Sequence, residues 1–381
     1  MNLDLFLTTD CNMRCTFCGA WKQDNAATYL PTERAKSILD DGRTYGFKFT
    51  TLSGGEPLMH PDLAEIIDHA DRSGYWINIT TNGLLIDKPF LDSIRNRKVN
   101  LRVSLHTLDA DEHRKLTGTD TFARLMDVVD LLKSERFYYS IGSTIHQGNV
   151  DSMEALADFA FKNNAAFIRF TPVAQVFKGR DFSLDEAFYE RMLRTIIALD
   201  KRYLRALRYE KQAMGRLVQP LNIMLTKRCP AGSRLFMIVD ASQELVPCQF
   251  IPLDSGYPHF PYSGVEDFER LRKAMDAVFQ KVRDQGMRGE CSACAFQYSC
   301  YGGCLGSRLP IGLDERDSPP VCMRKLLGKL VEELADADMD EVMAYWLYHF
   351  NSRTSGDDSN LSCMRKLPMW ELNFKHGVPR N

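Results

Sequence analysis

The stretch Cys11-Asn-Met-Arg-Cys15-Thr-Phe-Cys18 follows the apolar segment 3–7 and decides how this chain is predicted to fold and work. Gaps of three and two residues place three thiols on one short loop. Three thiolates suit three corners of a [4Fe–4S] cluster and leave the fourth iron open for a small molecule. The alternative is a zinc knuckle, but structural zinc needs four closed ligands, and the next histidine downstream is His60. We therefore predict an iron–sulfur cluster on this loop.

Length and charge limit the remaining possibilities. The 381 residues predict two domains, or one large domain with an extension. With 48 basic and 50 acidic residues the net charge is −2, so we expect neither a nucleic-acid nor a membrane partner. No run approaches the ~18 apolar residues of a membrane span, and the N-terminus begins with a strand-like segment rather than a signal peptide. Eleven cysteines without an export signal predict a cytoplasmic location.

Short β-branched or aromatic segments alternate with amphipathic ones up to about residue 175. Strands are predicted at 3–8, 49–53, 76–80, 100–105, 138–145 and 166–171. Helices are predicted between them at 31–45, 61–73, 90–97, 121–133 and 151–162. Six strand–helix units are too few for a closed eight-stranded barrel, so we predict an α/β fold with a partial (β/α)6 barrel. The active site of such a sheet lies at the C-terminal strand ends, where the cysteine loop follows the first strand.

A second motif, Ser53-Gly54-Gly55-Glu56-Pro57, follows the second predicted strand. Its glycines allow close approach of a ligand to the backbone, and its glutamate can hold an ammonium group. Taken alone, the motif could equally be an ordinary tight turn. Other polar residues at predicted strand ends are Asn82, Ser104, His106, Thr144, His146 and Thr171. Asn82 could simply form an Asn-Gly turn, and hydrogen-bonded structural roles are the simpler expectation for both histidines.

The three-cysteine loop with Phe17 before its last cysteine, followed one βα unit later by Gly-Gly-Glu-Pro, resembles the radical S-adenosylmethionine (SAM) enzymes. The resemblance implies that Cys11, Cys15 and Cys18 carry the catalytic cluster. It also implies that Gly54, Gly55, Glu56, Asn82, Ser104, Thr144 and Thr171 contact SAM, with Glu56 on the amino group. One departure concerns the SAM carboxylate, because threonine stands at position 117 where relatives often carry an arginine. Arg114 and Lys115 are both left as possible substitutes.

A second group of cysteines begins at Cys229 and continues with Cys248, Cys291, Cys294, Cys300, Cys304 and Cys322. One zinc site with spare thiols is an alternative, but seven thiolates exceed one tetrahedral site. The spacing resembles the SPASM extension of radical SAM enzymes, which implies two auxiliary [4Fe–4S] clusters. By this resemblance Cys291, Cys294, Cys300 and Cys322 hold one cluster. Cys229, Cys248 and Cys304 hold the other, whose fourth ligand stays open.

Two departures from the SPASM pattern and a domain scheme complete this prediction. Gln243 replaces the usual glycine before Cys248, and Gln249 replaces the aspartate that serves as proposed base in sulfatase-maturating members. Cys363 is expected to be a bystander. The predicted domains are a radical SAM barrel with helical bridge (1–220), a small α+β SPASM domain (221–325) with a hairpin at 235–239 and 244–246, and a C-terminal helix and tail (326–381).

The resemblance implies reductive cleavage of SAM to a 5′-deoxyadenosyl radical, which abstracts hydrogen from a substrate. We expect modification of a peptide or protein by a crosslink, thioether or oxidation. The alternative substrate is a small molecule, such as a sugar, nucleoside or aminoglycoside intermediate undergoing dehydrogenation or dehydration. An electron carrier or zinc scaffold would leave the Gly-Gly-Glu-Pro turn unexplained. A flavodoxin or ferredoxin is the expected electron donor, and a separate leader-binding protein would be needed because strand one begins at residue 3.

Overall fold

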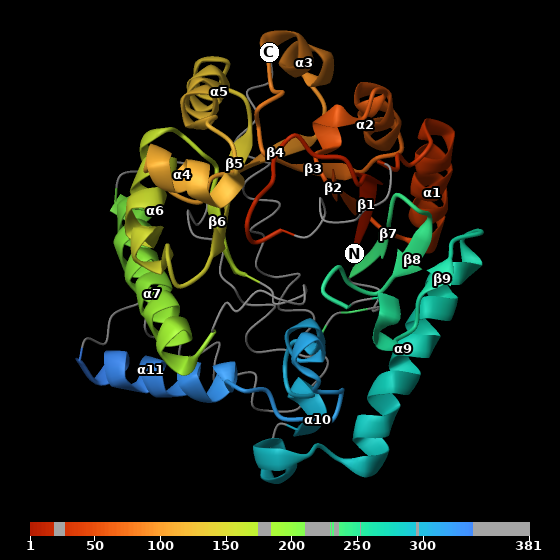
Figure 1. Ribbon diagram of the computed structural model, residues 1–381, viewed down its shortest axis with the longest axis vertical. Coiled ribbons are helices and arrows are strands. Elements are labelled where there is room, and N and C mark those ends of the chain that lie inside the picture. The colour runs from red at the N-terminus through yellow and green to blue at the C-terminus, as the bar shows by residue number, and fades with distance from the viewer. Residues whose placement is uncertain are drawn as a thin grey trace.

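One sheet organises the chain in a computed structural model that describes residues 1–18, 27–173, 184–209, 229, 231, 236–251, 253–294 and 297–337 (Figure 1). The strands run in the order β6-β5-β4-β3-β2-β1-β7-β8-β9. The parallel part consists of β1 (Asn2–Thr8), β2 (Phe49–Gly54), β3 (Trp76–Thr81), β4 (Val99–Ser104), β5 (Tyr139–Ile145) and β6 (Ile168–Pro172). Six parallel strands with intervening helices confirm the predicted partial barrel.

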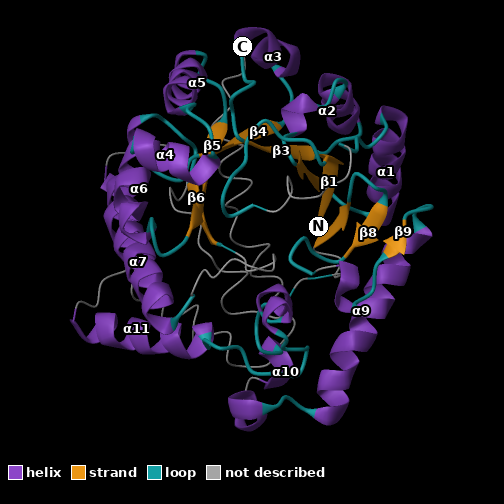
Figure 2. Cartoon of the chain, viewed as in Figure 1, coloured by secondary structure: helices purple, strands orange, loops and turns teal. Residues whose placement is uncertain are grey.

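Helices cover the outer face of the curved sheet, as Figure 2 shows. They are α1 (Thr32–Tyr45), α2 (Leu63–Arg72), α3 (Lys88–Ile94), α4 (Ala110–Thr117), α5 (Phe122–Ser134), α6 (Met153–Lys162) and α7 (Glu186–Tyr209). The last of these is the predicted helical bridge. Sequence analysis missed α4, which begins at the N-cap Asp109, whose carboxylate accepts the Glu112 amide at 2.8 Å.

Alternation of side chains gives the sheet two different faces. Leu3, Leu5 and Leu7 of β1 are completely buried and pack in the core beneath the helices. The intervening Asp4 lies on the opposite face, which we call the inner face because the sheet curves around it (Figure 1). Polar residues continue across this face, since Asn100 donates to Oδ1 of Asn78 at 2.7 Å. The partial barrel therefore has an apolar outer layer and a polar interior.

The predicted hairpin joins the barrel instead of forming its own sheet. Strand β7 (Phe236–Val239) pairs in parallel with β1, and β8 (Glu244–Val246) and β9 (Phe260–Pro261) follow antiparallel. Gln243, in the turn before β8, has φ of 66°, the left-handed conformation that favours glycine. Its side chain accepts the Nε–H of Arg34 at 3.0 Å, which ties this turn to α1. The sheet thus crosses the predicted domain boundary at residue 220.

The five cysteines from Cys291 to Cys322 lie in the region spanned by three further helices. These are α9 (Glu266–Gln285), which sequence analysis missed, α10 (Gln297–Cys300), and α11 (Met323–Ala337), which was predicted. Helix α9 buries Phe268, Leu271 and Met275 at helical spacing. The predictions for Cys363 and for the tail beyond residue 337 lie outside the described residues. No helix of the described part is long and apolar enough to cross a membrane.

Candidate active site

The three-cysteine loop is fixed at the C-terminal edge of the sheet by backbone hydrogen bonds to α4. The Arg14 amide donates to the carbonyl of Thr117 at 3.0 Å, and the Thr16 amide donates to that of Leu116 at 2.7 Å. Gly118 follows with φ of 71°, and a Cβ there would lie 3.2 Å from the Arg14 carbonyl oxygen. The helix that sequence analysis missed is therefore the support of the loop it singled out.

Cys11 leaves β1 in a polar environment suited to a cluster thiolate. The Met13 amide donates to Cys11 Sγ at 3.4 Å, and the side-chain amide of Asn82 lies 4.0 Å from the same sulfur. Burial raises the pKa of Cys11, and the negative charges of Glu56 and Cys18 raise it further. N–H groups directed at a thiolate offset its charge, as in iron–sulfur sites. The residues present therefore fit an iron–sulfur cluster.

Both glycines of the second motif are required by backbone packing. The Gly55 amide donates to the Thr8 carbonyl and the Glu56 amide to the Asp10 carbonyl, both at 2.7 Å. A Cβ on Gly55 would lie 2.0 Å from the Asp10 oxygen, and one on Gly54 would lie 2.4 Å from that of Thr8. The motif thus lies flat against the start of the cysteine loop, a reason for the glycines that sequence analysis did not consider.

Glu56 joins the ends of β2 and β3. Its carboxylate accepts the Thr81 hydroxyl at 2.7 Å, the Asn82 amide at 2.7 Å and the Leu58 amide at 3.0 Å. Only 1% of the residue is exposed, and this burial raises its pKa to about 6. An ionised carboxylate has about four acceptor positions, so three internal donors leave room for one more. The carboxylate can therefore support Asn82 and still accept a ligand ammonium.

Three predicted SAM contacts lie together on β4, β5 and β6. Ser104 pairs with Gly142, and Thr144 pairs with Thr171, so all lie near one edge of the barrel. The Thr144 amide donates to Nδ1 of His106 at 3.0 Å. Phe17 packs edge-on against that imidazole, with ring centroids 4.7 Å apart. The cysteine loop thus reaches across to these strand ends.

The histidines have the structural roles expected of them. Burial lowers the pKa of His106 to about 3, with His113 and His146 adding to the effect, so His106 is neutral. Its Nδ1 accepts a hydrogen bond, which places the proton on Nε2. Nδ1 of His146 similarly accepts the Gly148 amide at 3.0 Å. Both imidazoles brace the loops after β4 and β5.

The two possible substitutes for the missing arginine differ little in placement. Arg114 pairs with Asp111 at 2.7 Å on the exposed side of α4, and Lys115 is also exposed. Thr117 itself is buried and donates to the His113 carbonyl at 2.8 Å. Neither cation lies on the inner face of the sheet.

The C-terminal cysteines affect one another's pKa values in two sets. In one group, burial raises the pKa of Cys229 to about 11, and the charge of Cys304 raises it further; Cys229 and Cys304 likewise raise that of Cys248. In the other group, burial raises the pKa of Cys291 and of Cys300, and each feels the charge of Cys322. Cys294 also acts on Cys291. The thiols of each set therefore lie within electrostatic reach of one another.

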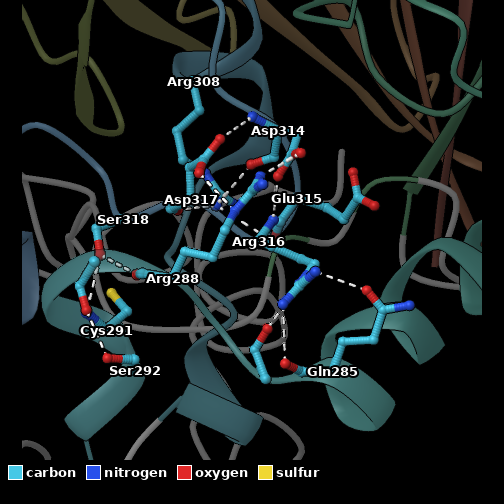
Figure 3. A network of polar contacts seen from close by, with 12 residues as sticks. Gln285, Arg288, Cys291, Ser292, Arg308, Asp314, Glu315, Arg316, Asp317 and Ser318 are labelled. Carbon is cyan, nitrogen blue, oxygen red and sulfur yellow. Dashed lines mark hydrogen bonds and ion pairs between the residues drawn. The ribbon is translucent and has the colours of Figure 1, made fainter.

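Arg308 lies fully buried in the C-terminal cysteine region, near the segment that carries Asp314 and Asp317 (Figure 3), and sequence analysis did not identify it. Its guanidinium donates to the carbonyls of Asp317 at 2.6 Å, Tyr301 at 2.8 Å and Asp314 at 3.1 Å. A Cβ on Gly302, whose φ is 70°, would lie 2.7 Å from Nη1. Gly302, between Cys300 and Cys304, was the signal that a bulky side chain packs there.

The 314–318 segment connects this arginine to Cys291. The Cys291 amide donates to Ser318 Oγ at 2.9 Å, and that hydroxyl donates to the Arg288 carbonyl at 2.7 Å. Nε of Arg288 pairs with Asp317 at 2.9 Å (Figure 3). Within the described ranges, no three His, Cys, Asp or Glu side chains converge as around a single metal ion.

Fold and site together define an iron–sulfur enzyme built on a partial parallel barrel. Residues 5–160 match the Radical SAM superfamily, so this part of the chain is a radical SAM domain, and the region after it is rich in cysteines like that of its SPASM-type relatives. Members use a [4Fe–4S] cluster and SAM.

Two relatives and one solved structure illustrate the similarity. AdoMet-dependent heme synthase of Methanosarcina barkeri is 26% identical over 339 residues, covering 83% of this chain and 94% of the relative. Mycofactocin maturase MftC of Mycobacterium tuberculosis is 24% identical over 325 residues, covering 84% and 81%. Streptococcus suis SuiB bound to S-adenosylmethionine has the same fold, with a TM-score of 0.64 at 17% identity over 84% of this chain and 76% of SuiB.

Proposed function

We propose that this enzyme uses SAM to abstract hydrogen from a peptide or protein and so introduces a crosslink, thioether or oxidation. The observation that carries the radical chemistry is the three-cysteine loop hydrogen-bonded to the Gly54–Glu56 turn at the barrel edge. The peptide substrate is supported by two similar proteins. MftC is named a maturase, and SuiB has been solved bound to the precursor peptide SuiA.

Cys11, Cys15 and Cys18 would hold the catalytic cluster. When bound, that cluster supplies the electron for reductive cleavage of SAM. The chain's own residues prepare the site for it: Met13 and Asn82 direct amides at Cys11, and Glu56 holds Asn82 in place. Glu56 would also accept the SAM ammonium. Gly54, Gly55, Asn82, Ser104, Thr144 and Thr171 would line the rest of the SAM site, with Phe17 beside it.

The C-terminal cysteines would hold two auxiliary [4Fe–4S] clusters, which gives three in all. Cys291, Cys294, Cys300 and Cys322 form a complete ligand set for one. Cys229, Cys248 and Cys304 leave one iron of the other open to substrate, a carboxylate or water. Such clusters suit electron removal from a substrate radical, because burial and hydrogen bonds tune their potentials.

The remaining proposals concern organisation and partners. We keep the domain limits 1–220, 221–325 and 326–381 as functional units, although the sheet is shared between the first two. A flavodoxin or ferredoxin would deliver the electron, and a separate protein would present a leader peptide. A cytoplasmic location suits thiolate ligands, which need reducing conditions.

Anaerobic reconstitution with iron and sulfide counting tests the proposal. Three clusters predict about twelve irons and about twelve sulfides per chain. Cys15→Ala should abolish 5′-deoxyadenosine formation and keep about eight irons. Cys304→Ala should remove about four irons and leave SAM cleavage intact. About four irons together with zinc in the wild type would instead make the C-terminal cysteines a structural metal site.

A small-molecule substrate is the second candidate, and the heme synthase from Methanosarcina barkeri favours it, because that relative's name describes synthesis of a small cofactor. The two candidates differ in what accelerates SAM cleavage. A peptide substrate should raise 5′-deoxyadenosine formation above the background rate, and its mass should change. If only small metabolites do so, the second candidate is correct.

A further inference from the structure

Two arginines face each other across β5 on the inner face of the barrel. Arg102 is on β4 and Arg169 on β6, and Gly142 of β5 pairs with both Ser104 and Arg169. Cγ and Cδ of Arg102 lie 3.1 Å from the point where a Cβ on Gly142 would be. The stem of Arg102 therefore crosses over β5 toward β6. Any larger residue at 142 would block this crossing.

Neither guanidinium is neutralised within the described part of the chain. No hydrogen bond or ion pair joins Arg102 or Arg169 to another described residue, and Nε of Arg102 is buried without a partner. The carboxylate of Asp4 on β1 acts electrostatically on both, but no ion pair joins it to either arginine in the described part of the chain. Burial and the charge of Arg169 lower the pKa of Arg102 to about 9, which fits two cations held close together.

Burying an uncompensated charge is costly, and placing two like charges side by side adds to that cost. An anion bound between the two cations would offset both costs. Arginine is suited to this because its planar fork matches a carboxylate with two parallel hydrogen bonds. Both residues also lie close below Ser104, Thr144 and Thr171, where the reaction would take place.

We propose that Arg102 and Arg169 form a carboxylate-binding site inside the barrel. The carboxylate has two possible sources: the methionyl end of SAM, or an acidic group of the substrate. This inference rests on the proposed function. It deepens that function by specifying that the molecule bound at the inner face carries a carboxylate. Neither Arg114 nor Lys115 is then needed for the SAM carboxylate.

The test uses the full-length, anaerobically reconstituted protein as wild type, Arg102→Met and Arg169→Met. Arg95→Met is the matched control, since Arg95 is ion-paired to Asp92 and Glu135 on the outer surface. The first measurement is the affinity for SAM and for decarboxylated SAM, which lacks only the carboxylate. If the site binds SAM, both inner-face variants lose at least about tenfold in SAM affinity and none for the decarboxylated analogue.

The second measurement compares N-acetylglutamate amide with N-acetylglutamine amide in the presence of SAM. If the site binds a substrate carboxylate, the glutamate probe raises the Tm of the wild type and of Arg95→Met more than the glutamine probe does. That difference disappears in Arg102→Met and Arg169→Met, while SAM affinity stays unchanged. The proposal is wrong if both inner-face variants match the wild type in both measurements.

Two controls separate a binding role from a structural one. Because neither guanidinium has a hydrogen-bond or ion-pair partner among the described residues, the ligand-free Met variants should melt no lower than the wild type, and Arg→Lys at each site should restore part of the affinity. A structural arginine would instead lower Tm without ligand. SAM cleavage by the dithionite-reduced wild type is measured separately, so a failure of the proposed function is not confused with a failure of the anion site.

Discussion

The side-chain amide of Asn82 lies 4.0 Å from Sγ of Cys11, while the backbone amide of Asn82 donates to the buried carboxylate of Glu56. The same side chain donates to Asn12 Oδ1 at 2.6 Å. Asn82, the residue that follows β3, thus links the glutamate of the second motif to the first cysteine of the cluster loop. The two motifs, which lie about forty residues apart in sequence, therefore form one hydrogen-bonded unit.

Asn82→Ala should lower the reduction potential of the N-terminal cluster without removing it. The substitution deletes an N–H group near the Cys11 thiolate, and such groups stabilise the reduced, more negative cluster. A redox titration followed by electron paramagnetic resonance measures the shift. Asn78→Ala is the control, because Asn78 is a side-chain amide of β3 with no cysteine contact among the described residues. An unchanged potential in Asn82→Ala would show that this amide does not act on the cluster.

Gly55→Ala should prevent the cysteine loop from closing. A Cβ there would lie 2.0 Å from the Asp10 oxygen, so β1 and the turn must separate and lose two backbone hydrogen bonds. We expect a loss of about 3 kcal/mol or more in stability and failure to load the N-terminal cluster. Gly264→Ala is the control, since its Cβ would meet only the flexible Glu266 carboxylate at 3.2 Å. Thermal melting and iron content measure both effects, and equal behaviour of the two variants contradicts the packing argument.

SAM affinity should rise with pH through about 6. Burial raises the folded-state pKa of Glu56 from 4.5 to about 6, so the carboxyl is protonated below that pH and cannot hold an ammonium. The same pKa shift also affects stability. The contribution of Glu56 to the free energy of unfolding is fully present only below about pH 4.5, and about 2 kcal/mol of it is lost as the pH rises through 6.

Glu56→Gln should bind SAM weakly at every pH between 5 and 8. Asp92→Asn serves as the control, because Asp92 is an ion-paired carboxylate on the outer surface, away from the inner face of the sheet. It should keep the pH dependence of SAM affinity seen in the wild type. Should Glu56→Gln retain that dependence, the titrating group is not Glu56.

Arg308→Met should destabilise the C-terminal cysteine region selectively. The guanidinium is fully buried and serves several carbonyls of the 301–317 region, which methionine would leave unsatisfied. A loss of about 3–5 kcal/mol is expected, with loss of auxiliary iron. SAM cleavage at the N-terminal cluster should persist. Arg191→Met, which removes a surface ion pair with Asp151, should change little; iron counting and 5′-deoxyadenosine formation distinguish the two.

Much of the barrel could be predicted because its strands are dense in β-branched and aromatic residues. Helix α4 escaped because it is short and buries only His113 and Thr117, so no apolar stripe marks it. Helix α9 did carry an apolar stripe at Phe268, Leu271 and Met275, so its helical spacing could have been recognised from the sequence.

The site was predicted by residue type more completely than by role. Cysteine spacing indicated the metal chemistry, but the glycine roles and the Asn82 contact depend on which backbones approach each other in space. Arg102 and Arg169 looked like ordinary strand residues, although an arginine on the same face as Asn100 and Asp4 signals a polar interior. Arg308 could not be assigned, because its partners are carbonyls, which every sequence supplies equally.

The pairing of β7 with β1 determines what happens if the protein is divided. A polypeptide ending at residue 220 would keep all six barrel strands but would turn β1 into an uncovered edge strand. Such edges pair with other chains and promote aggregation. The strand that delivers Cys11 would then be frayed or occupied by a neighbouring molecule. The C-terminal region therefore covers the edge of the strand that leads into Cys11, and it does so independently of any metal that its own cysteines bind.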